Sequence, residues 1–385
     1  MKLAYLGKVQ LSDVDLSYLN EAQKLADITC VFETNPRFQR GPAFSLQAIY
    51  PKSGVFKAVD IYPELERLQG FIDTDKLYVV NTSGRLWQLK SFWTHLLLLR
   101  FLIKGHYDAI HLAWPPNIYE FVLYFLRRKM LLTVHDPFPH TAHNSLIVKI
   151  RRKVAFSLIP KLIILNKAQS NHFIQHYRLK DDRVINSSLS SYTYLNTIVP
   201  TRENIPDNGS YILFAGRISP YKGIDYLLPA MEKVNRQCPD CRLIVAGGGK
   251  YHFDISRYKK LDYIDIRNRF IPDDELVALL QHAAFVVCPY TDATQSGVIM
   301  SAYAFCKPVV ATNVGGLPEM VHHGHYGLIV KNNDTDALAE AICQLWKNQD
   351  QLQHFSRQIE QDYIEGELSW RKIAHELNVV YRKNK

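Results

Sequence analysis

Two groups of residues in the second half of the chain have the types and spacing needed to hold a phosphate. The first lies in a polar loop, where Thr294, Gln295, Ser296 and Gly297 precede a predicted helix over residues 298–305. A helix N-terminus carries free N–H groups, and a glycine beside it leaves the backbone open to a ligand. A phosphate binds well at such a position because its charge and its oxygen acceptors match these donors.

The second group comes earlier in the chain. Gly216 and Arg217 follow an apolar stretch that predicts a strand, and Lys222 with Gly223 comes shortly afterwards. Two cations near a strand end can neutralise a diphosphate. Taken alone, each group is more often an ordinary capped helix or a pair of solvated surface charges. Their order and spacing within one α/β segment predict a nucleotide-diphosphate site.

Length and composition limit the classes to which the chain can belong. Its 385 residues predict two domains. The composition, 47% hydrophobic and 22% charged, is that of an ordinary globular protein, and no run of about 18 apolar residues predicts a transmembrane helix. The first residues lead directly into a predicted strand at Leu3–Leu6, so we expect no signal peptide and a cytoplasmic location.

The chain is basic, with a net charge of +9 and a pI of about 9.1. This balance favours anionic partners, but the absence of nucleic-acid motifs from the sequence makes nucleic acid an unexpected one. Two apolar stretches, residues 92–104 and 121–129, carry basic residues toward their ends. They either lie on an anionic membrane surface or form buried helices whose charges complement the helix dipole. Burial is the favoured interpretation.

Apolar runs and helical segments alternate along both halves, which is the pattern of parallel sheets with crossover helices. The predicted strands are Leu3–Leu6, Leu77–Val80, Ala109–Ala113, Leu131–Val134, Leu162–Leu165, Tyr211–Ala215, Leu243–Ala246, Ile264–Phe270, Phe285–Cys288 and Val309–Thr312. A stretch rich in Pro, Asn and Asp separates the halves. We therefore predict a first domain over residues 1–198, a linker over 199–208, a second domain over 209–366 and a terminal helix over 367–385.

A set of motifs resembles the donor-binding domain of retaining glycosyltransferases of family 4, within the glycosyl transferases group 1. These motifs run in register over roughly residues 209 to 346 and are Gly216-Arg217 with Lys222-Gly223, Leu243 to Gly247, Phe270-Ile271 with Glu275-Leu276, Cys288-Pro289, Ala302 to Ala304 with Lys307 to Thr312, Gly315 to Glu319, and Gly327 to Val330. The first half resembles the acceptor domain at Tyr107 to His111 and at Val134-His135-Asp136. The resemblance implies an α/β chain with the GT-B fold, which has two facing Rossmann-like domains with parallel sheets and a cleft between them. It also implies that the last helix crosses back to the first domain.

The resemblance assigns roles to individual residues. Arg217 and Lys222 match the pair that binds the donor diphosphate, and His135 matches a histidine that faces the donor sugar across the cleft. These three are the expected catalytic residues. The backbone of Ile271 matches the position that reads the nucleobase. The other expected donor-binding residues are Gly216, Thr294, Gln295, Ser296, Gly297, Val298 and Ser301.

The chain departs from the family pattern where a Glu-x7-Glu pair is common. Ala293 and Ser301 stand at these two positions, and Ser301 could hold a ribose hydroxyl only weakly or through a water. Asp292, Thr294 or Gln295 could take over the sugar contact. Gln295 is the preferred substitute, because a side-chain amide both donates and accepts hydrogen bonds. The glycine-rich loop expected after the first strand retains a single glycine.

Motifs that could bind a metal are weak. Cys238 and Cys241 have the spacing of zinc ligands but lack a second pair, so a place in the core is favoured. Two Asp-x-Asp triplets, residues 13–15 and 73–75, have the form used by metal-dependent transferases of another fold, but they lie outside the nucleotide-binding half. No metal or other cofactor is therefore expected.

The resemblance implies a metal-independent enzyme that moves a sugar, with retention, from a UDP- or GDP-sugar to a glycan or lipid-linked acceptor hydroxyl. Cell-surface polysaccharide assembly is the expected setting. The expected partners are this donor, this acceptor and an anionic membrane surface, contacted peripherally at the inner face. The missing Glu pair leaves two alternatives open: a non-catalytic sugar-nucleotide-binding partner subunit, and a sugar-nucleotide epimerase of the same fold.

Overall fold

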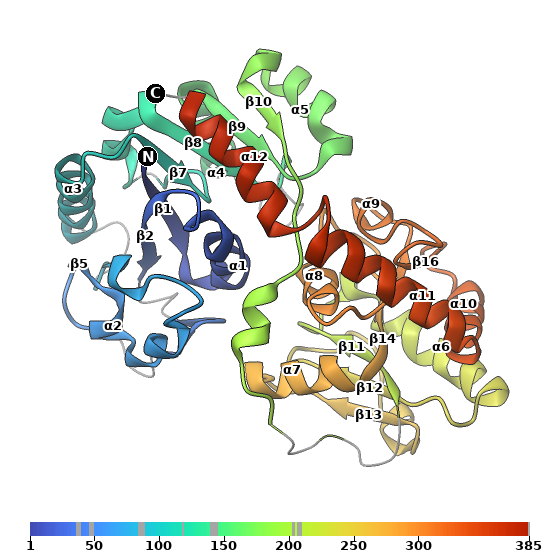
Figure 1. Cartoon of the computed structure of the whole chain (residues 1–385). Helices are drawn as coiled ribbons and strands as arrows, with labels where there is room; N and C mark the ends of the chain where they lie inside the picture. The colour runs from blue at the N-terminus through green and yellow to red at the C-terminus, as the bar shows by residue number, and fades with distance from the viewer. Residues whose placement is uncertain are drawn as a thin grey trace. The chain divides into compact units, whose positions relative to one another are not determined.

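The computed structural model describes residues 1–35, 40–45, 50–83, 89–117, 119–138, 145–201, 205 and 210–383. The chain forms two compact units (Figure 1). The N-terminal unit comprises Met1–Leu189 together with Trp370–Lys385, and the C-terminal unit comprises Ser190–Ser369. Both units are α/β, each with its own largely parallel sheet. No helix in the described part of the chain combines the length and the apolar character needed to span a membrane.

The N-terminal unit contains an eight-stranded sheet in the order β10-β9-β8-β7-β1-β2-β6-β5. Its neighbouring strands are parallel except for β5, which pairs antiparallel with β6. The strands are β1 (Lys2–Lys8), β2 (Asp27–Thr34), β5 (Gly54–Lys57), β6 (Leu77–Asn81), β7 (Ala109–Leu112), β8 (Met130–Val134), β9 (Lys161–Ile164) and β10 (Val184–Asn186). A two-stranded ribbon joins β3 (Arg40–Gly41) and β4 (Phe44–Ser45). The helices are α1 (Ser12–Ala22), α2 (Ala58–Ile61), α3 (Leu89–Lys104), the 3-10 helix η4 (Phe121–Lys129), α4 (Leu146–Leu158), α5 (Ser170–Tyr177) and α12 (Trp370–Lys383).

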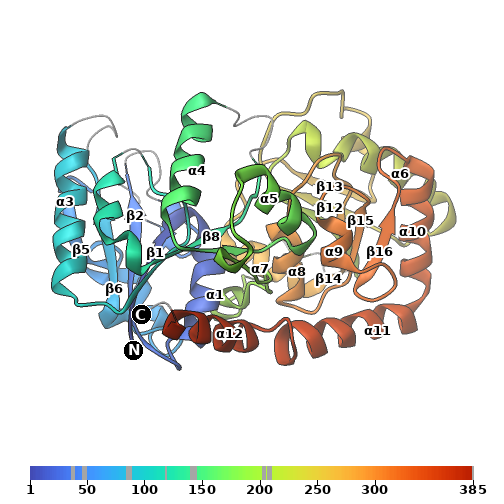
Figure 2. The same cartoon turned by 90° about the horizontal axis from the view of Figure 1, so that it is seen from above.

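The two faces of this sheet bury different side chains, because neighbouring residues of a strand point in opposite directions. Ala4 of β1 and Ile110 of β7 share a core with residues of α3, η4 and α4. On the other face α12 packs against α1 (Figure 2), and the Tyr381 and Tyr18 hydroxyls lie 2.6 Å apart. His111, which points to the α12 face, lies 2.6 Å from the Tyr381 hydroxyl through Nδ1. Burial lowers the pKa of His111 to about 3, which suits the structural role expected for this histidine.

The C-terminal unit contains a six-stranded parallel sheet in the order β13-β12-β11-β14-β15-β16. The strands are β11 (Tyr211–Ala215), β12 (Leu243–Ala246), β13 (Ile264–Arg267), β14 (Ala283–Cys288), β15 (Val309–Thr312) and β16 (Gly327–Val330). The helices are α6 (Ile224–Gln237), α7 (Asp273–His282), α8 (Gly297–Tyr303), α9 (Leu317–Val321), α10 (Thr335–Lys347), α11 (Gln349–Ile359) and the π-helix η11 (Glu360–Glu365). All ten strands predicted from the sequence are present. β13 ends before the predicted limit, because the Arg269 N–H turns back to the Arg267 carbonyl and leaves Phe270 exposed.

The two units divide between Leu189 and Ser190, earlier than the predicted boundary at residue 198. The segment after the division belongs to the C-terminal unit, because the Tyr192 N–H donates to the Met300 carbonyl at 3.0 Å. The ring of Tyr192 also lies against the start of α8. Most of the predicted linker, residues 202–204 and 206–208, lies outside the described residues.

Candidate functional site

The carboxyl ends of β11 and β14 lie side by side in the middle of the C-terminal sheet. From β11 the chain moves outward to β12 and β13, whereas from β14 it moves outward in the other direction. In an open parallel sheet, such a change of direction leaves a crevice at the strand ends where ligands bind. Gly216, Arg217 and Lys222 follow β11, and the polar loop that ends at Ser296 follows β14. The structure therefore brings the two predicted phosphate-binding groups to one place.

Lys222 is a desolvated cation at these strand ends. Its Nζ lies 3.6 Å from the centre of the Tyr290 ring and 5.2 Å from the centre of the Tyr221 ring. Burial lowers the pKa of Lys222 from 10.5 to about 8. Within the described part of the chain, no carboxylate lies at ion-pair distance from this ammonium. A cation that has lost water without gaining a carboxylate favours the binding of an anion.

The loop that carries this lysine is held against the loop after β14. Gly223 has a φ of 67°, in the left-handed region, and a Cβ there would lie 1.8 Å from the Pro289 carbonyl oxygen. Only glycine fits this close approach. The Thr291 N–H donates to the Tyr221 carbonyl at 2.8 Å and joins the same two loops. The backbone contacts between these two loops therefore fix where the Lys222 side chain begins.

The start of α8 lies at the same edge of the sheet. The Ser296 hydroxyl donates to the Tyr290 hydroxyl at 3.3 Å and makes no capping hydrogen bond to the helix. A Cβ on Gly216 would lie 3.4 Å from the Val298 side chain, so the end of β11 is close to the first turn of α8. Gly297, the first residue of that turn, is exposed.

The polar residues around α8 differ in what they can offer a ligand. Thr294 and Gln295 are partly exposed on the loop that precedes the helix. The Ser301 hydroxyl donates to the Gly297 carbonyl at 3.0 Å, which leaves its oxygen lone pairs as acceptors. Ala293 offers no polar side chain. Neither residue therefore reproduces a carboxylate at the Glu-x7-Glu positions.

Ile271 lies between β13 and α7, on a connection that a partly exposed ion-pair network holds. Glu275 accepts two hydrogen bonds of 2.7 Å from Arg269 and one of 3.1 Å from Arg267. Burial works to raise the pKa of Glu275, but the hydrogen bonds and charges of the two arginines bring it below its ordinary value. The predicted nucleobase position is therefore supported by a carboxylate that stays ionised.

His135 follows β8 in the N-terminal unit. Its ring stacks on Trp114, with centroids 4.8 Å apart and planes at 5°, and its Nε2 has no hydrogen-bond partner in the described part of the chain. Burial lowers the pKa of His135 to about 4, against the opposing charge of Asp136. The imidazole is neutral at pH 7, so it can exchange a hydrogen bond with a ligand hydroxyl but carries no charge.

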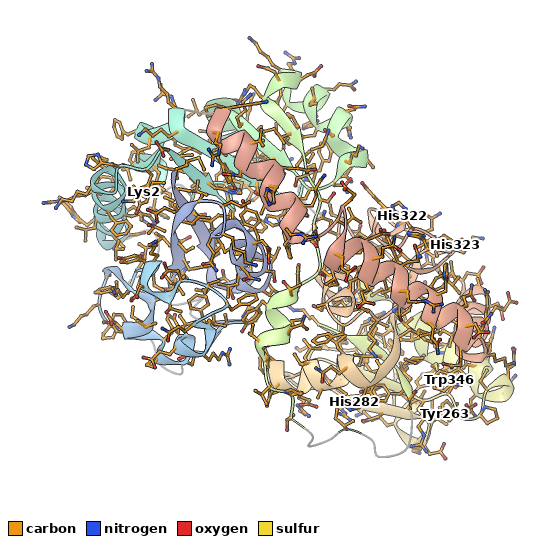
Figure 3. The ribbon with its side chains drawn as sticks, viewed as in Figure 1. Lys2, Tyr263, His282, His322, His323 and Trp346 are labelled. Atoms are coloured by element: carbon orange, nitrogen blue, oxygen red, sulfur yellow. The ribbon has the colours of Figure 1, made fainter. Side chains whose placement is uncertain are left out.

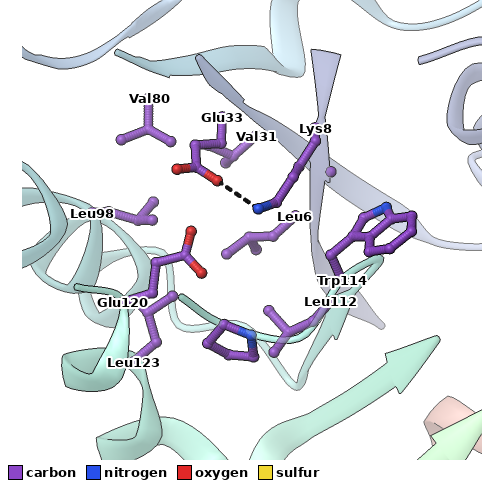
Figure 4. A pocket seen from close by; sticks show the side chains of 12 residues that line it. Leu6, Lys8, Val31, Glu33, Val80, Leu98, Leu112, Trp114, Glu120 and Leu123 are labelled. Carbon is purple, nitrogen blue, oxygen red and sulfur yellow. Dashed lines mark ion pairs between the residues drawn. The ribbon is translucent and has the colours of Figure 1, made fainter. Parts of the chain in front are cut away.

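A small cavity of about 30 Å³ lies in the N-terminal unit where the carboxyl ends of β1 and β7 are neighbours (Figure 4). Lys8 and Glu33 form an ion pair of 3.2 Å in it. Glu120 lies close by, and its Oε1 is 3.8 Å from the Nε2 of His95. Burial and the charge of Glu33 raise the pKa of Glu120 to about 8. Lys8, Glu33, His95 and Glu120 thus form one cluster. Sequence reasoning missed this cluster because its members come from four separate segments.

One set of three potential metal ligands occurs among the described residues, and it belongs to this cluster. The ligand atoms of Glu33, His95 and Glu120 all lie within 4.8 Å of one another. His95 Nδ1 lies 2.7 Å from the Ser91 carbonyl oxygen, and Nε2 has no hydrogen-bond partner among the described residues. These residues could hold a cation, but the Lys8 ammonium already supplies positive charge to the carboxylates.

The sequence motifs that suggested metal ligands have other partners. Asp15 is buried and accepts a hydrogen bond of 2.7 Å from a tyrosine hydroxyl. Cys238 and Cys241 are buried free cysteines. Between them, Asp240 accepts a hydrogen bond of 3.0 Å from Nε1 of Trp346, at the end of α10 (Figure 3). The cysteines therefore belong to the core between α6 and α10, as favoured from the sequence.

The aromatic surroundings of Lys222 are the part of the C-terminal site that sequence reasoning missed. Tyr290 lies two residues after Cys288, where the predicted strand ends. This position in the sequence could have indicated that Tyr290 belongs to the site. An aromatic residue just past the carboxyl end of a central parallel strand lies where ligands bind.

The fold defines the class of protein. Anabaena Alr3699/HepE, solved in complex with UDP, has a TM-score of 0.68 and 17% identity to this chain, with 100% of each chain covered. At this identity the likeness concerns the fold, which is the GT-B fold of two α/β units with parallel sheets. The predicted fold class is confirmed.

The sequence comparisons then show which proteins the chain resembles. The model described as glycosyl transferases group 1 matches residues 209–348, which confirms the predicted resemblance for this part of the chain. An uncharacterized glycosyltransferase of Methanocaldococcus jannaschii is 26% identical over 291 residues, 73% of this chain and 75% of the relative. A D-inositol 3-phosphate glycosyltransferase of Corynebacterium aurimucosum is 29% identical over 282 residues, 64% of this chain and 66% of the relative.

Proposed function

We propose that the chain is a retaining, metal-independent glycosyltransferase whose C-terminal unit binds a nucleotide-sugar through its diphosphate. The observation that carries this proposal is the desolvated Lys222 ammonium, which lies at the switch point of a parallel sheet without a carboxylate partner. Arg217 is exposed on the same loop and adds a second cation. A diphosphate supplies the negative charge that both residues lack.

We favour UDP over GDP as the nucleotide of the donor, because the structural relative HepE of Anabaena was solved with UDP. We place the nucleobase against the backbone of Ile271, on the loop that Glu275 supports. The acceptor would be a hydroxyl of a glycan or a lipid-linked glycan, in the assembly of a cell-surface polysaccharide. The basic surface of the N-terminal unit supports a lipid-linked acceptor.

The chemistry we propose needs no carboxylate pair. When the nucleotide leaves from the face that the acceptor attacks, its phosphate oxygen can take the proton of the acceptor hydroxyl. The contribution of the protein is then orientation, together with the stabilisation of charge on the leaving phosphate by Arg217 and Lys222. His135 is neutral and would contact a sugar hydroxyl. This mechanism is compatible with Ala293 and Ser301 at the Glu-x7-Glu positions.

Titration calorimetry with UDP and GDP, in the presence of a chelator, tests the site. We expect Arg217→Ala and Lys222→Ala to weaken binding of the preferred nucleotide at least tenfold, because each removes a cation from the diphosphate. The matched control is Lys259→Ala, on an exposed turn of the same unit, which should bind as the wild type does. Normal binding by Arg217→Ala and Lys222→Ala would refute this site.

A non-catalytic nucleotide-sugar-binding subunit is the second candidate, because Ser301 uses its hydroxyl hydrogen on the helix backbone and Ala293 has no polar group. An epimerase of the same fold is the third. The products formed from a UDP-sugar separate the three functions. A transferase releases UDP only with an acceptor present, an epimerase converts the free donor to its epimer, and a binding subunit leaves the donor unchanged.

A further inference from the structure

Three consecutive elements, α3, η4 and α4, cover one face of the N-terminal sheet. Their inward side chains belong to a single core, which includes Leu98, Leu123 and Phe156. The Phe92 and Phe121 rings stack with their centroids 5.9 Å apart, so α3 and η4 are direct neighbours. The inward sides of the three elements share one core, and we call their outward sides together the α3–η4–α4 face; Figure 2 labels α3 and α4.

This face is apolar to an unusual degree. Ten of the fifteen exposed large hydrophobic side chains among the described residues lie on these three elements. The ten are Trp93, Leu97, Ile103, Phe121, Phe125, Leu146, Ile147, Ile150, Val154 and Leu158. Phe125 is 78% exposed and Leu146 is 71% exposed, so neither belongs to a core. A concentration of this kind marks an interaction surface, whereas single exposed hydrophobic residues are common and carry no such meaning.

The same elements have an extreme charge pattern. The sequences of α3, η4 and α4 contain three, three and four Lys or Arg residues, respectively, and no Asp or Glu. The nearest acidic residue in sequence is Glu120, which is buried in the cluster with Lys8. Lys149 and Lys153 are exposed one helical turn apart on α4, beside an apolar row that contains Ile147, Ile150 and Val154.

These observations determine the chemistry of the partner. A second copy of this chain would bring two acid-free basic surfaces together, and the charges would repel each other. A purely apolar partner would leave the basic side chains unpaired. An anionic lipid surface meets both needs, because its acyl boundary accepts aromatic and aliphatic side chains while its headgroups pair with Lys and Arg.

We propose that the α3–η4–α4 face docks the protein on an anionic membrane. This inference deepens the proposed function, since it places the enzyme where a lipid-linked acceptor would be found. The structure modifies the favoured interpretation of residues 92–104 and 121–129, because these segments are buried on one side only and expose the other. α4, which the sequence did not single out, contributes half of the exposed apolar side chains of the face.

Vesicle co-sedimentation of the full chain tests the proposal. One set of vesicles contains phosphatidylcholine alone, and the other contains an equal mixture of phosphatidylcholine and phosphatidylglycerol. We expect binding to the anionic set, with at least a tenfold loss in Leu146→Ser/Ile147→Ser and a similar loss in Lys149→Gln/Lys153→Gln. The matched charge control is Lys259→Gln/Lys260→Gln on the C-terminal unit, which should bind as the wild type does. Raising the salt concentration should weaken wild-type binding.

Two results would overturn the proposal. One is equal binding of the wild type to both vesicle sets, or no binding to either. The other is a dimer in analytical ultracentrifugation that Leu146→Ser/Ile147→Ser dissociates, because the face would then belong to a second copy. Nucleotide binding, measured on the same preparations, confirms that each variant is folded. A chain that binds UDP but no vesicles contradicts only the docking face, and one that binds vesicles but no nucleotide contradicts only the proposed function.

Discussion

Replacing Lys222 by methionine should stabilise the unliganded protein and abolish nucleotide binding. Burial lowers the pKa of Lys222 from 10.5 to about 8, and no carboxylate within the described residues offsets the lost hydration. A difference of roughly 2.5 pKa units corresponds to about 3 kcal/mol that the charged form costs at pH 7, which is an upper limit for the gain in the variant. Methionine keeps contact with the Tyr290 ring through its thioether, so little packing is lost.

The same pKa determines how nucleotide affinity depends on pH. The diphosphate of a UDP-sugar has no ionisation between pH 7 and 9, and the change in affinity is compared with that of Lys222→Arg, which shares any effect of uracil N3–H ionisation near pH 9. In the free protein about one Lys222 side chain in ten is protonated at pH 9, and we expect binding of UDP-glucose to be roughly tenfold weaker than at pH 7. Stability without ligand should change in the opposite direction. The unfolded chain binds more protons between pH 8 and 10.5, so the free energy of unfolding rises across this window.

Calorimetry at both pH values and urea unfolding at pH 7 measure these effects. Lys222→Arg is the charge-retaining variant and should bind at pH 9 as well as at pH 7, because arginine does not titrate in this range. Lys259→Met serves as the control for the loss of one exposed lysine. The reasoning fails if Lys222→Met binds UDP-glucose normally, or if the wild type binds equally well at the two pH values.

Three further predictions concern the supports of the two units. Gly223→Ala should destabilise the protein by about 1–3 kcal/mol in urea unfolding and weaken UDP binding, because its φ of 67° and the nearby backbone oxygen exclude a side chain; unchanged stability would contradict this geometry. Glu275→Gln should destabilise the protein by about 1–2 kcal/mol because it weakens the charge-assisted hydrogen bonds from Arg267 and Arg269, and wild-type stability should fall as pH drops through the lowered pKa of Glu275; a variant with flat, wild-type stability would be inconsistent with the network. Tyr381→Phe should cost about 1–3 kcal/mol, since it leaves buried polar partners without a hydrogen bond, and hydrogen exchange should show α12 opening more readily; an unchanged exchange rate would argue against it.

Local sequence patterns determined most of the secondary structure and indicated which residues form the proposed donor site. β11, β12 and β15 have the predicted limits, because short apolar runs bounded by Gly, Pro or charged residues leave little freedom in where a buried parallel strand begins. β2 and α11 were missed. Asp27–Thr34 mixes polar residues into a strand that is buried on both sides, and only its place between β1 and β6 explains that burial.

Only the tertiary structure determined the surroundings of the site residues, and with them their pKa values and exposure. The sequence placed Lys222 in a glycine loop, but its low pKa depends on burial, and Tyr290 from the loop after β14 lies against the ammonium without supplying charge. The cluster of Lys8, Glu33 and Glu120 follows from the order of the strands, which brings together residues far apart in the chain. The docking face depends on which side of each helix the sheet covers. The composition of these segments indicated apolar and basic residues. Which of these side chains are exposed depends on how the helices pack against the sheet.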